Sequence, residues 1–243
     1  LRGSNGADRV SVNANSATTD SLVVNFSNVE RMVLEGGAGN DTYQFSALPV
    51  TTTIVDSNGA DSLDFSNATQ GVRVDLGKNS RQKVFGTGNT LTLKGTIETV
   101  IGSALADSIR GNAANNVLVG GAGNDRLDGG AGKDVILGGS GSDTLRGGSG
   151  EDLLIADTTL YDSNRLALAA LLKDWTSPGA FAERSRRLSA GIQDSAAGTV
   201  QLKKGVSVLD DQARDALFGG SHNDWFCGLF AWDAIGDRDR NGH

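Results

Sequence analysis

Acidic residues recur at a fixed interval in the middle of the chain. Every ninth residue from position 107 to position 152 is an acid or its amide: Asp107, Asn116, Asp125, Asp134, Asp143 and Asp152. If two nonapeptides complete one coil of the backbone, turns on the same side recur in every second nonapeptide. Asp107 then stacks on Asp125 and Asp143, and Asp134 stacks on Asp152. Files of carboxylate oxygens are suitable ligands for a hard divalent cation.

Stacked carboxylates repel one another unless a cation lies between them. Adjacent strands are roughly 4.8 Å apart, and two carboxylates about 5 Å apart repel by roughly 3 kcal/mol at an effective dielectric constant of about 20. Ca²⁺ reverses the sign because it takes about 6–8 oxygens in flexible geometry, whereas Mg²⁺ prefers a compact octahedron. Zinc and copper lack their usual ligands, which are limited to His222, His243 and Cys227. The alternative is a metal-free coil in which Asp only forms turns.

The acids belong to a tandem nonapeptide repeat. Residues 102–155 divide into GSALADSIR, GNAANNVLV, GGAGNDRLD, GGAGKDVIL, GGSGSDTLR and GGSGEDLLI. The last four units fit G-G-x-G-x-D-x-U-x, in which U is a large apolar residue. Gly at positions one, two and four permits backbone angles that other residues avoid and lets carbonyl groups crowd one point. We expect the apolar position eight to point inward from a short strand, which gives a thin core.

This block resembles the nonapeptide block of the RTX (repeats-in-toxin, hemolysin-type calcium-binding) family. The resemblance implies an all-β fold, namely a right-handed parallel β-roll or β-solenoid with Ca²⁺ between successive turns. It also implies that the position-six Asp and early-turn carbonyl groups supply the ligands. Carried over, the side-chain ligands are Asp107, Asp125, Asp134, Asp143 and Asp152. The carbonyl ligands are those of Gly121, Gly123, Gly130, Gly132, Gly139 and Gly141.

Two units depart from the family pattern. GSALAD has Leu105 at the fourth position, and GNAANN has Ala114 there and Asn116 in place of Asp. We therefore expect weaker or empty sites at these turns, above all for the Asn116–Asp134 pair.

Single copies of the repeat precede the block, as GSNGADRVS, GGAGNDTYQ and DSNGADSLD. Asp41 and Asp61 in the second and third copies are separated by slightly more than two repeat lengths, close to one coil, so we predict that they share an ion. Alternating polar and apolar residues predict strands over 21–26, 71–76 and 90–93. We expect residues 1–101 to continue the solenoid with longer, irregular coils.

The composition changes after Ala156. We predict a helix over 162–175 with Asp162 or Ser163 as its N-cap, a second over 177–188 with Pro178 at its first helical position, and a strand pair over 199–209. This helical insert, residues 157–209, is interpreted as a structural cap on the open end of the solenoid. A docking face or part of an export signal is the alternative.

The last segment returns to the nonapeptide. DDQARDALF, GGSHNDWFC and GLFAWDAIG place Asp215, Asp224 and Asp233 at position six. His222 stands where the fourth-position Gly belongs, so residues 210–243 are either a further calcium coil or a degenerate C-terminal cap packed by Trp225, Phe226 and Trp232. The chain thus divides into 1–101, the regular roll 102–156, the insert 157–209 and the C-terminal segment 210–243.

The composition restricts the class of function. The net charge of −7 argues against nucleic-acid binding, and no apolar run is long enough for a membrane-spanning helix. The sequence has no HExxH, GxSxG or P-loop motif, so we expect no enzyme; any activity of a parent protein is expected upstream of Leu1. Because the chain begins inside a repeat-like phrase, we interpret it as the C-terminal part of a longer protein.

We expect a calcium-induced folding module of a secreted bacterial protein, located outside the cell or at its surface. The resemblance also implies export by type I secretion machinery. The alternatives are a calcium-stiffened adhesive or surface-layer spacer with a glycan or protein partner, and an accessory domain of an exported enzyme.

Overall fold

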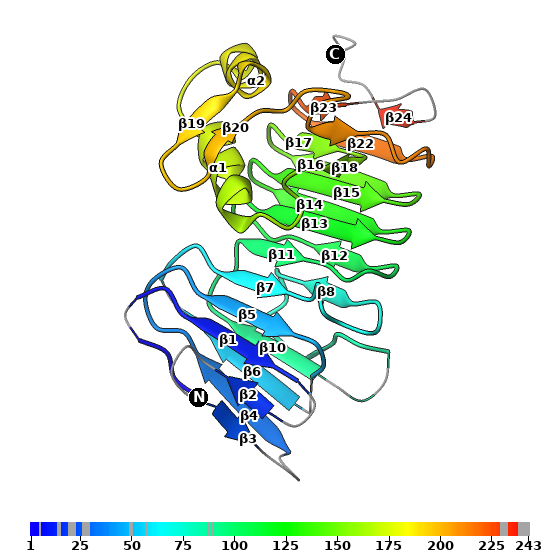
Figure 1. The fold of residues 1–243 in the computed structure, drawn as a ribbon. Helices are drawn as coiled ribbons and strands as arrows, with labels where there is room; N and C mark the ends of the chain where they lie inside the picture. Colours follow the sequence, from blue (N-terminus) through cyan, green and yellow to red (C-terminus); the bar gives the residue numbers. More distant parts are fainter. Residues whose placement is uncertain are drawn as a thin grey trace.

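The computed structural model describes residues 1–4, 6–13, 16–18, 23–25, 30–48, 51–56, 58–86, 88, 90–228 and 233–237. Strands dominate the described chain, and its only two helices are short. Figure 1 shows the strands stacked in rows along one axis, from the N-terminal coils to the C-terminal coils. The predominance of strands and their largely parallel pairing agree with the predicted all-β fold.

The longest sheet has ten strands in the order β23-β17-β15-β13-β11-β7-β5-β1-β2-β3. Pairing is parallel from β23 to β1 and antiparallel from β1 to β3. Its strands are β1 (Arg9–Val12), β2 (Ser16–Thr18), β3 (Val23–Asn25), β5 (Thr42–Phe45), β7 (Ser62–Asp64), β11 (Thr99–Ile101), β13 (Val117–Ala122), β15 (Val135–Ser140), β17 (Leu153–Ile155) and β23 (Trp225–Cys227).

Two further sheets supply the alternate strands. The six-stranded sheet has the order β24-β22-β16-β14-β12-β8, and the four-stranded sheet has the order β4-β6-β10-β9. Their strands are β4 (Arg31–Glu35), β6 (Thr51–Val55), β8 (Arg73–Asp75), β9 (Gln82–Lys83), β10 (Thr90–Lys94), β12 (Ser108–Arg110), β14 (Arg126–Ala131), β16 (Thr144–Ser149), β22 (Ala216–Ser221) and β24 (Ala234–Asp237). The predicted strands over 71–76 and 90–93 are β8 and β10; of the strand predicted over 21–26, residues 23–25 form β3 and the others lie outside the described residues.

The strand register shows that two nonapeptides make one coil, as predicted. Val117 pairs with Val135, and Arg126 pairs with Thr144, so each strand lies beside its equivalent two repeats further on. The N-terminal coils are longer. The residues that precede successive strands of the ten-stranded sheet are offset by 33 from β1 to β5, by 20 from β5 to β7 and by 37 from β7 to β11. The same sheet therefore runs through regular and irregular coils.

The position-eight side chains form the continuous core between the sheets. Each is at most 1% exposed: Ile109, Leu118, Leu127, Ile136, Leu145 and Leu154. The wider N-terminal coils fill their core with aromatic rings, and Phe45 stacks on Phe65 with centroids 5.6 Å apart. Burial of one apolar side chain per nonapeptide explains the low apolar content of the repeats.

The insert contains α1 (Arg165–Trp175), α2 (Phe181–Ala190) and the antiparallel pair β19 (Ile192–Asp194) and β20 (Gly198–Val200). Its neck is the pair β18 (Thr158–Thr159) and β21 (Val208–Leu209). The strand pair predicted over 199–209 is therefore wrong, because its two halves pair with different partners.

The predicted helix starts are also wrong. Helix α1 is capped by Asn164, whose Oδ1 accepts the Ala167 N–H at 3.1 Å, because Asp162 is engaged by Thr159 instead. Helix α2 begins at Phe181, after Pro178, and its N-cap Ala180 provides no side-chain hydrogen bond.

The predicted role of the insert as an end cap is wrong as well, because the insert covers the flank of the ten-stranded sheet (Figure 1). Positions seven and nine of every second nonapeptide are apolar there, and they pack against α1 in a second core: Val117, Val119, Val135, Leu137, Leu153 and Ile155. Arg165 of α1 also forms an ion pair with Asp64 of β7. The insert thus braces several coils from the side.

The coils resume after the insert. Thr144 of β16 pairs with Ala216 of β22, and the acids just before these strands are separated by 72 positions instead of the usual 18. The additional residues therefore leave the coil without changing its register. Trp225 of β23 stacks on Trp175 of α1 at 5.9 Å, and Phe226 packs against the main core. Trp232, predicted to pack the same coil, lies outside the described residues.

Candidate metal centre

The acids of alternate repeats form a file along the six-stranded sheet, which we call the first file. Its members each precede a strand of that sheet: Asp107, Asp125, Asp143, Asp215 and Asp233. One oxygen of each acid accepts the backbone N–H of the residue one coil before it, which is Val72 for Asp107 and another acid of the file for the rest. The N–H groups of Asp107 and Asp125 are 2.7 and 2.8 Å from the Oδ1 atoms of Asp125 and Asp143. The same bond joins Asp143 to Asp215 across the insert at 2.6 Å.

The second file follows the ten-stranded sheet along the whole stack. It consists of Asp8, Asp41, Asp61, Glu98, Asn116, Asp134, Asp152 and Asp224, each immediately before a strand. The N–H of Asp134 donates to Asp152 Oδ1 at 2.9 Å, and the N–H of Asn116 donates to Asp134 Oδ1 at 2.7 Å. The structure therefore brings together the acids that the sequence pattern paired.

The second carboxylate oxygen of most repeat acids has no hydrogen-bond partner. Oδ2 is buried and unpartnered in Asp125, Asp134, Asp143 and Asp152, and also in Asp41 and Asp215. These residues are at most 3% exposed. An unpaired buried carboxylate oxygen is costly. A row of such oxygens therefore fits a bound cation.

Burial shifts the titration of these acids. Desolvation is the largest cause, and it raises the pKa of Asp134 and Asp143 to about 8 and that of Asp125 and Asp152 to about 7. The backbone N–H bonds oppose this shift, while neighbouring acids add to it. Without a bound cation at neutral pH, these carboxyl groups must either be protonated or remain charged while buried.

Glycines let the turns approach one another closely. The six predicted carbonyl donors have φ between 99° and 120°, a region that other residues rarely adopt: Gly121, Gly123, Gly130, Gly132, Gly139 and Gly141. A Cβ on Gly139 would collide with the Gly121 carbonyl oxygen, so that oxygen lies directly against the next coil. Gly123, Gly130 and Gly132 place their carbonyl oxygens in the same way. Gly139 and Gly141 themselves face the turn that contains the insert.

The two irregular repeats satisfy their side chains locally. The N–H of Ser103 donates to Asp107 Oδ2 at 2.5 Å, and its hydroxyl donates to Oδ1 at 2.9 Å. In the next unit, the N–H of Asn112 donates to Asn116 Oδ1 at 2.9 Å. Asp107 accordingly has no unpartnered oxygen, in contrast to the acids of the regular repeats, which is consistent with the weaker sites expected there.

The N-terminal coils hold a compact acidic group that the sequence only partly indicated. Asp41, Asp56 and Asp61 are buried, and each offers an oxygen within 4.8 Å of the others. The N–H of Asp41 donates to Asp61 Oδ1 at 2.8 Å, and the Tyr43 hydroxyl donates to Asp56 Oδ2 at 2.6 Å. Asp56 stands at position one of its unit, where the pattern expects Gly, and this replacement is the signal that could have identified it.

Glu98 is an acid of the second file that the sequence analysis did not identify. It takes the place of a position-six acid just before β11, and its Oε2 accepts the Asp61 N–H at 2.7 Å. No nonapeptide surrounds Glu98, so only its distance of two repeat lengths from Asn116 indicates its place.

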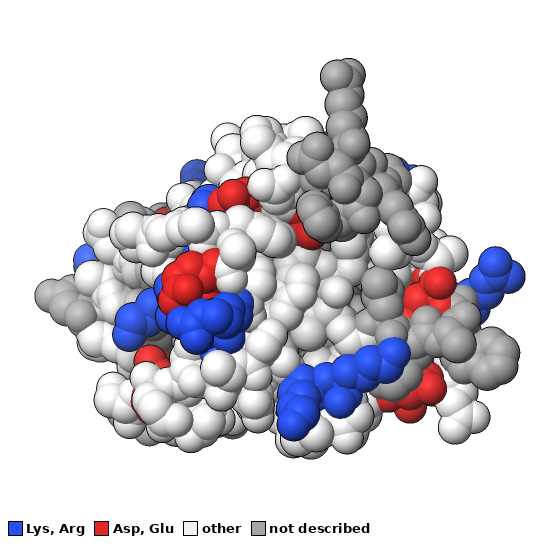
Figure 2. Space-filling model, turned by 90° about the horizontal axis from the view of Figure 1, so that it is seen from above, with Lys and Arg blue, Asp and Glu red and all other residues white. Residues whose placement is uncertain are grey.

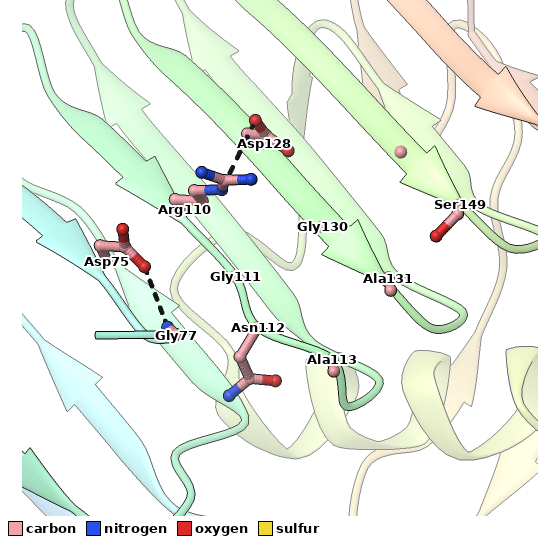
Figure 3. A pocket seen from close by; sticks show the side chains of 11 residues that line it. Asp75, Gly77, Arg110, Gly111, Asn112, Ala113, Asp128, Gly130, Ala131 and Ser149 are labelled. Carbon is pink, nitrogen blue, oxygen red and sulfur yellow. Dashed lines mark hydrogen bonds and ion pairs between the residues drawn. The ribbon is translucent and has the colours of Figure 1, made fainter. Parts of the chain in front are cut away.

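A groove of about 670 Å³ follows the outer side of the six-stranded sheet. Figure 3 shows Asp75, Arg110 and Asp128 on one side of it and small turn residues on the other. Asp75 accepts the Gly77 N–H at 3.0 Å, and Asp128 pairs with Arg110 at 3.8 Å. Among the described residues, the groups of three acids with clustered oxygens lie elsewhere. The files, rather than this groove, are thus the better candidates for a cation site.

Comparison with known proteins identifies the repeats. A model of the RTX calcium-binding nonapeptide repeat matches four copies, over residues 33–44, 101–136 and 128–158. The chain carries RTX calcium-binding nonapeptide repeats. The match includes Asp41 and all five predicted side-chain ligands of the regular block. It does not extend to residues 210–236, and a search of curated proteins finds no relative.

The RTX repeats make calcium the ion to consider. The repeat acids are buried in the turns and contribute little to the surface. Seen from the C-terminal end, charged side chains lie in small mixed groups on a largely uncharged visible surface (Figure 2). Neither α1 nor α2 is long and apolar enough to cross a membrane.

Proposed function

We propose that this chain is a calcium-driven folding module, a right-handed β-roll that forms around Ca²⁺ outside the cell. The observation that carries the proposal is the row of buried, unpartnered Oδ2 atoms in Asp125, Asp134, Asp143 and Asp152. The RTX repeats supply the calcium chemistry.

The donor set favours Ca²⁺ over other cations. The regular turns bring carboxylates and backbone carbonyl oxygens close together between successive coils. Hard oxygen donors in an irregular arrangement suit Ca²⁺, whereas Mg²⁺ requires a near-ideal octahedron and thiolate or imidazole ligands suit zinc. The residues predicted to bind, Asp41 and Asp61 included, are the residues we propose as ligands.

Ion binding and folding are coupled in this arrangement. The ligands of one site come from turns a whole coil apart, so the site exists only when the coils have stacked. Binding free energy then becomes folding free energy. Modules that act outside cells typically bind Ca²⁺ at about 10⁻⁴–10⁻³ M, so we propose that the chain stays unfolded at cytosolic calcium and folds after export.

The module is proposed to have no catalytic role of its own. The position-six acids are engaged in the stacked files, where they bond to the backbone of the neighbouring coil. A parent protein, if the chain is part of one, would carry any activity elsewhere.

A calcium titration followed by far-UV circular dichroism tests the proposal. We expect little β structure in chelator and a cooperative gain in Ca²⁺ but not in equal Mg²⁺. Replacing Asp134 and Asp143 together by Ala should raise the calcium midpoint about tenfold or more, because two sites each lose a charged ligand.

The matched control is Glu183→Gln, which removes one exposed acid from α2. Its midpoint should equal that of the unaltered chain, because an exposed ion pair contributes little. A chain that is equally folded in chelator and in Ca²⁺ would overturn the proposal.

A further inference from the structure

The turn that contains the insert is assembled from two distant pieces of chain. The intact turn 138–143 meets both pieces in the next coil. The Ala156 carbonyl accepts the Gly139 N–H at 3.2 Å, and Asp211 and Asp215 accept the N–H groups of Gly141 and Asp143 at 2.5 and 2.6 Å. We call residues 156–157 together with 211–215 the split turn.

Few hydrogen bonds between described residues join the two pieces of the split turn. The neck pairs two residues of β18 with two of β21, and it adds bonds from the Thr158 hydroxyl to the Leu209 carbonyl and from the Leu160 N–H to the Ser207 carbonyl. Within the split turn itself, the Asp211 N–H reaches Asp157 Oδ1 at 3.4 Å, which is long for a hydrogen bond. Closing the insert constrains a long loop and costs chain entropy, so a stronger connection at this place would be useful.

Acidic side chains converge on the split turn. Asp157, Asp215 and Asp233 each offer an oxygen within 4.8 Å of the others. Asp157 and Asp215 are 1% exposed, and the Oδ2 atom of each is buried without a partner. None of the ion pairs found among the described residues involves Asp157 or Asp215. Asp157 and Asp215, each with an unpartnered carboxylate oxygen, thus lie close to the carboxylate of Asp233.

We propose that Asp157, Asp215 and Asp233 bind a calcium ion that clasps the two ends of the insert. Asp157 stands at position two of its turn, where the regular repeats have Gly, so it adds a third carboxylate to the position-six acids Asp215 and Asp233. The ion would join the residue before the first strand of the neck to the first and last C-terminal nonapeptides. The inference rests on the proposed calcium binding only in the choice of ion.

The clasp connects calcium to the docking of the insert. Asp157 directly precedes β18, and Asp215 directly precedes β22, so the ion fixes both ends of the insert relative to the C-terminal coil. That coil carries Trp225, which stacks on Trp175 of α1 at 5.9 Å with an interplanar angle of 27°. The stacked indoles therefore report whether the insert is seated against the roll.

The test compares two signals during calcium titration of the whole chain. Near-UV circular dichroism follows the Trp175–Trp225 stack, and far-UV circular dichroism follows the strands. For Asp157→Asn we expect the near-UV midpoint to rise about tenfold, because a carboxylate ligand is lost. The far-UV midpoint should stay unchanged, which also shows that the variant folds. Equilibrium dialysis at a calcium concentration between the two near-UV midpoints should find one Ca²⁺ fewer per chain.

Two further variants make the outcome decisive. Asp233→Asn removes another carboxylate of the clasp and should shift the near-UV midpoint in the same direction, whereas Glu183→Gln on the insert surface should not. If Asp233→Asn shifts this midpoint and Asp157→Asn does not, the ion is an ordinary repeat ion and the clasp is refuted. Unchanged near-UV midpoint and stoichiometry in Asp157→Asn also refute it while calcium-driven folding stands. A chain without any calcium response refutes both proposals.

Discussion

Asp134→Asn should stabilise the protein without calcium and destabilise it with calcium. Asp134 is 0% exposed, its Oδ1 accepts the Asn116 N–H at 2.7 Å, and its Oδ2 has no partner. An amide keeps the accepting oxygen and the side-chain volume but carries no charge. Asn already fits this file, since Asn116 occupies the equivalent place one coil earlier.

The magnitude follows from the pKa. Burial raises the pKa of Asp134 from 3.8 to about 8. Keeping this group in the metal-free fold at pH 7 therefore costs on the order of 4 kcal/mol relative to a neutral side chain. Relaxation and water entry reduce that value, so we expect a gain of about 1–3 kcal/mol in the free energy of unfolding in chelator. With calcium the same substitution removes a charged ligand, and the calcium midpoint should rise about tenfold.

Because the metal-free chain is largely unfolded, its folding in chelator is followed by titration with a stabilising osmolyte, and its unfolding in saturating calcium by titration with urea, both by far-UV circular dichroism. Glu183→Gln is the control for loss of one negative charge, and it should change neither free energy by more than about 0.5 kcal/mol. Equal destabilisation of Asp134→Asn in both solutions would show that Oδ2 does not face an ion. The electrostatic reasoning would then be refuted.

Three further predictions concern pH, strain and the insert. The raised pKa values of Asp134 and Asp143 mean that the metal-free fold is most stable below about pH 4 and loses this stability as pH rises towards 8, so far-UV circular dichroism in chelator should show more strand structure at pH 4 than at pH 8. His222 has φ of 82° at a position that is Gly in the regular repeats, so His222→Gly should raise the free energy of urea unfolding by about 1 kcal/mol, and a loss would contradict the strain argument. Glu151→Gln leaves the buried Arg184 without its carboxylate, so thermal unfolding of the insert should report a loss of about 2 kcal/mol, and an unchanged melting temperature would show that the pair is dispensable.

The regular coils were predictable from sequence because each residue type has one physical role there. Gly at the turn, acid before the strand and one apolar residue within it recur in every nonapeptide. The coil of two nonapeptides and the stacking of Asp134 on Asp152 follow directly. In the N-terminal coils the offsets vary from 20 to 37. Without a constant period, the pairing of Glu98 with Asp61 could not be foreseen.

The insert shows a different limit. Local signals indicated two helices, but the starts were wrong because Asn164 and not Asp162 caps α1. Capping residues compete, and tertiary contacts decide among neighbours of similar propensity. The prediction of a strand pair over 199–209 was wrong for a related reason. Residue 199 lies in β20 and residue 209 in β21, and their partners, β19 and β18, are set by closure of the insert.

The repeats do, however, contain a sequence pattern that indicates the docking of the insert on the flank. Positions seven and nine alternate in character from one nonapeptide to the next. Along the ten-stranded sheet they are Val117 and Val119, then Val135 and Leu137, all nearly inaccessible to water. In β12, β14 and β16 of the six-stranded sheet the corresponding residues include Arg126 and are polar. A face that is apolar in every second nonapeptide requires a cover, because a large exposed apolar patch is unfavourable in water.

The insert supplies that cover without disturbing the stack. It leaves the coil at Asp157 and returns before Asp215, and the first-file bond from Asp143 to Asp215 is made as if the coil were unbroken. An insertion that changed the register by one residue would turn Leu217 from the core to the surface. The stack thus tolerates an insertion only where both ends can be held in one turn. Converging acids at that turn make the same ion chemistry that joins the coils available to join the insert to them.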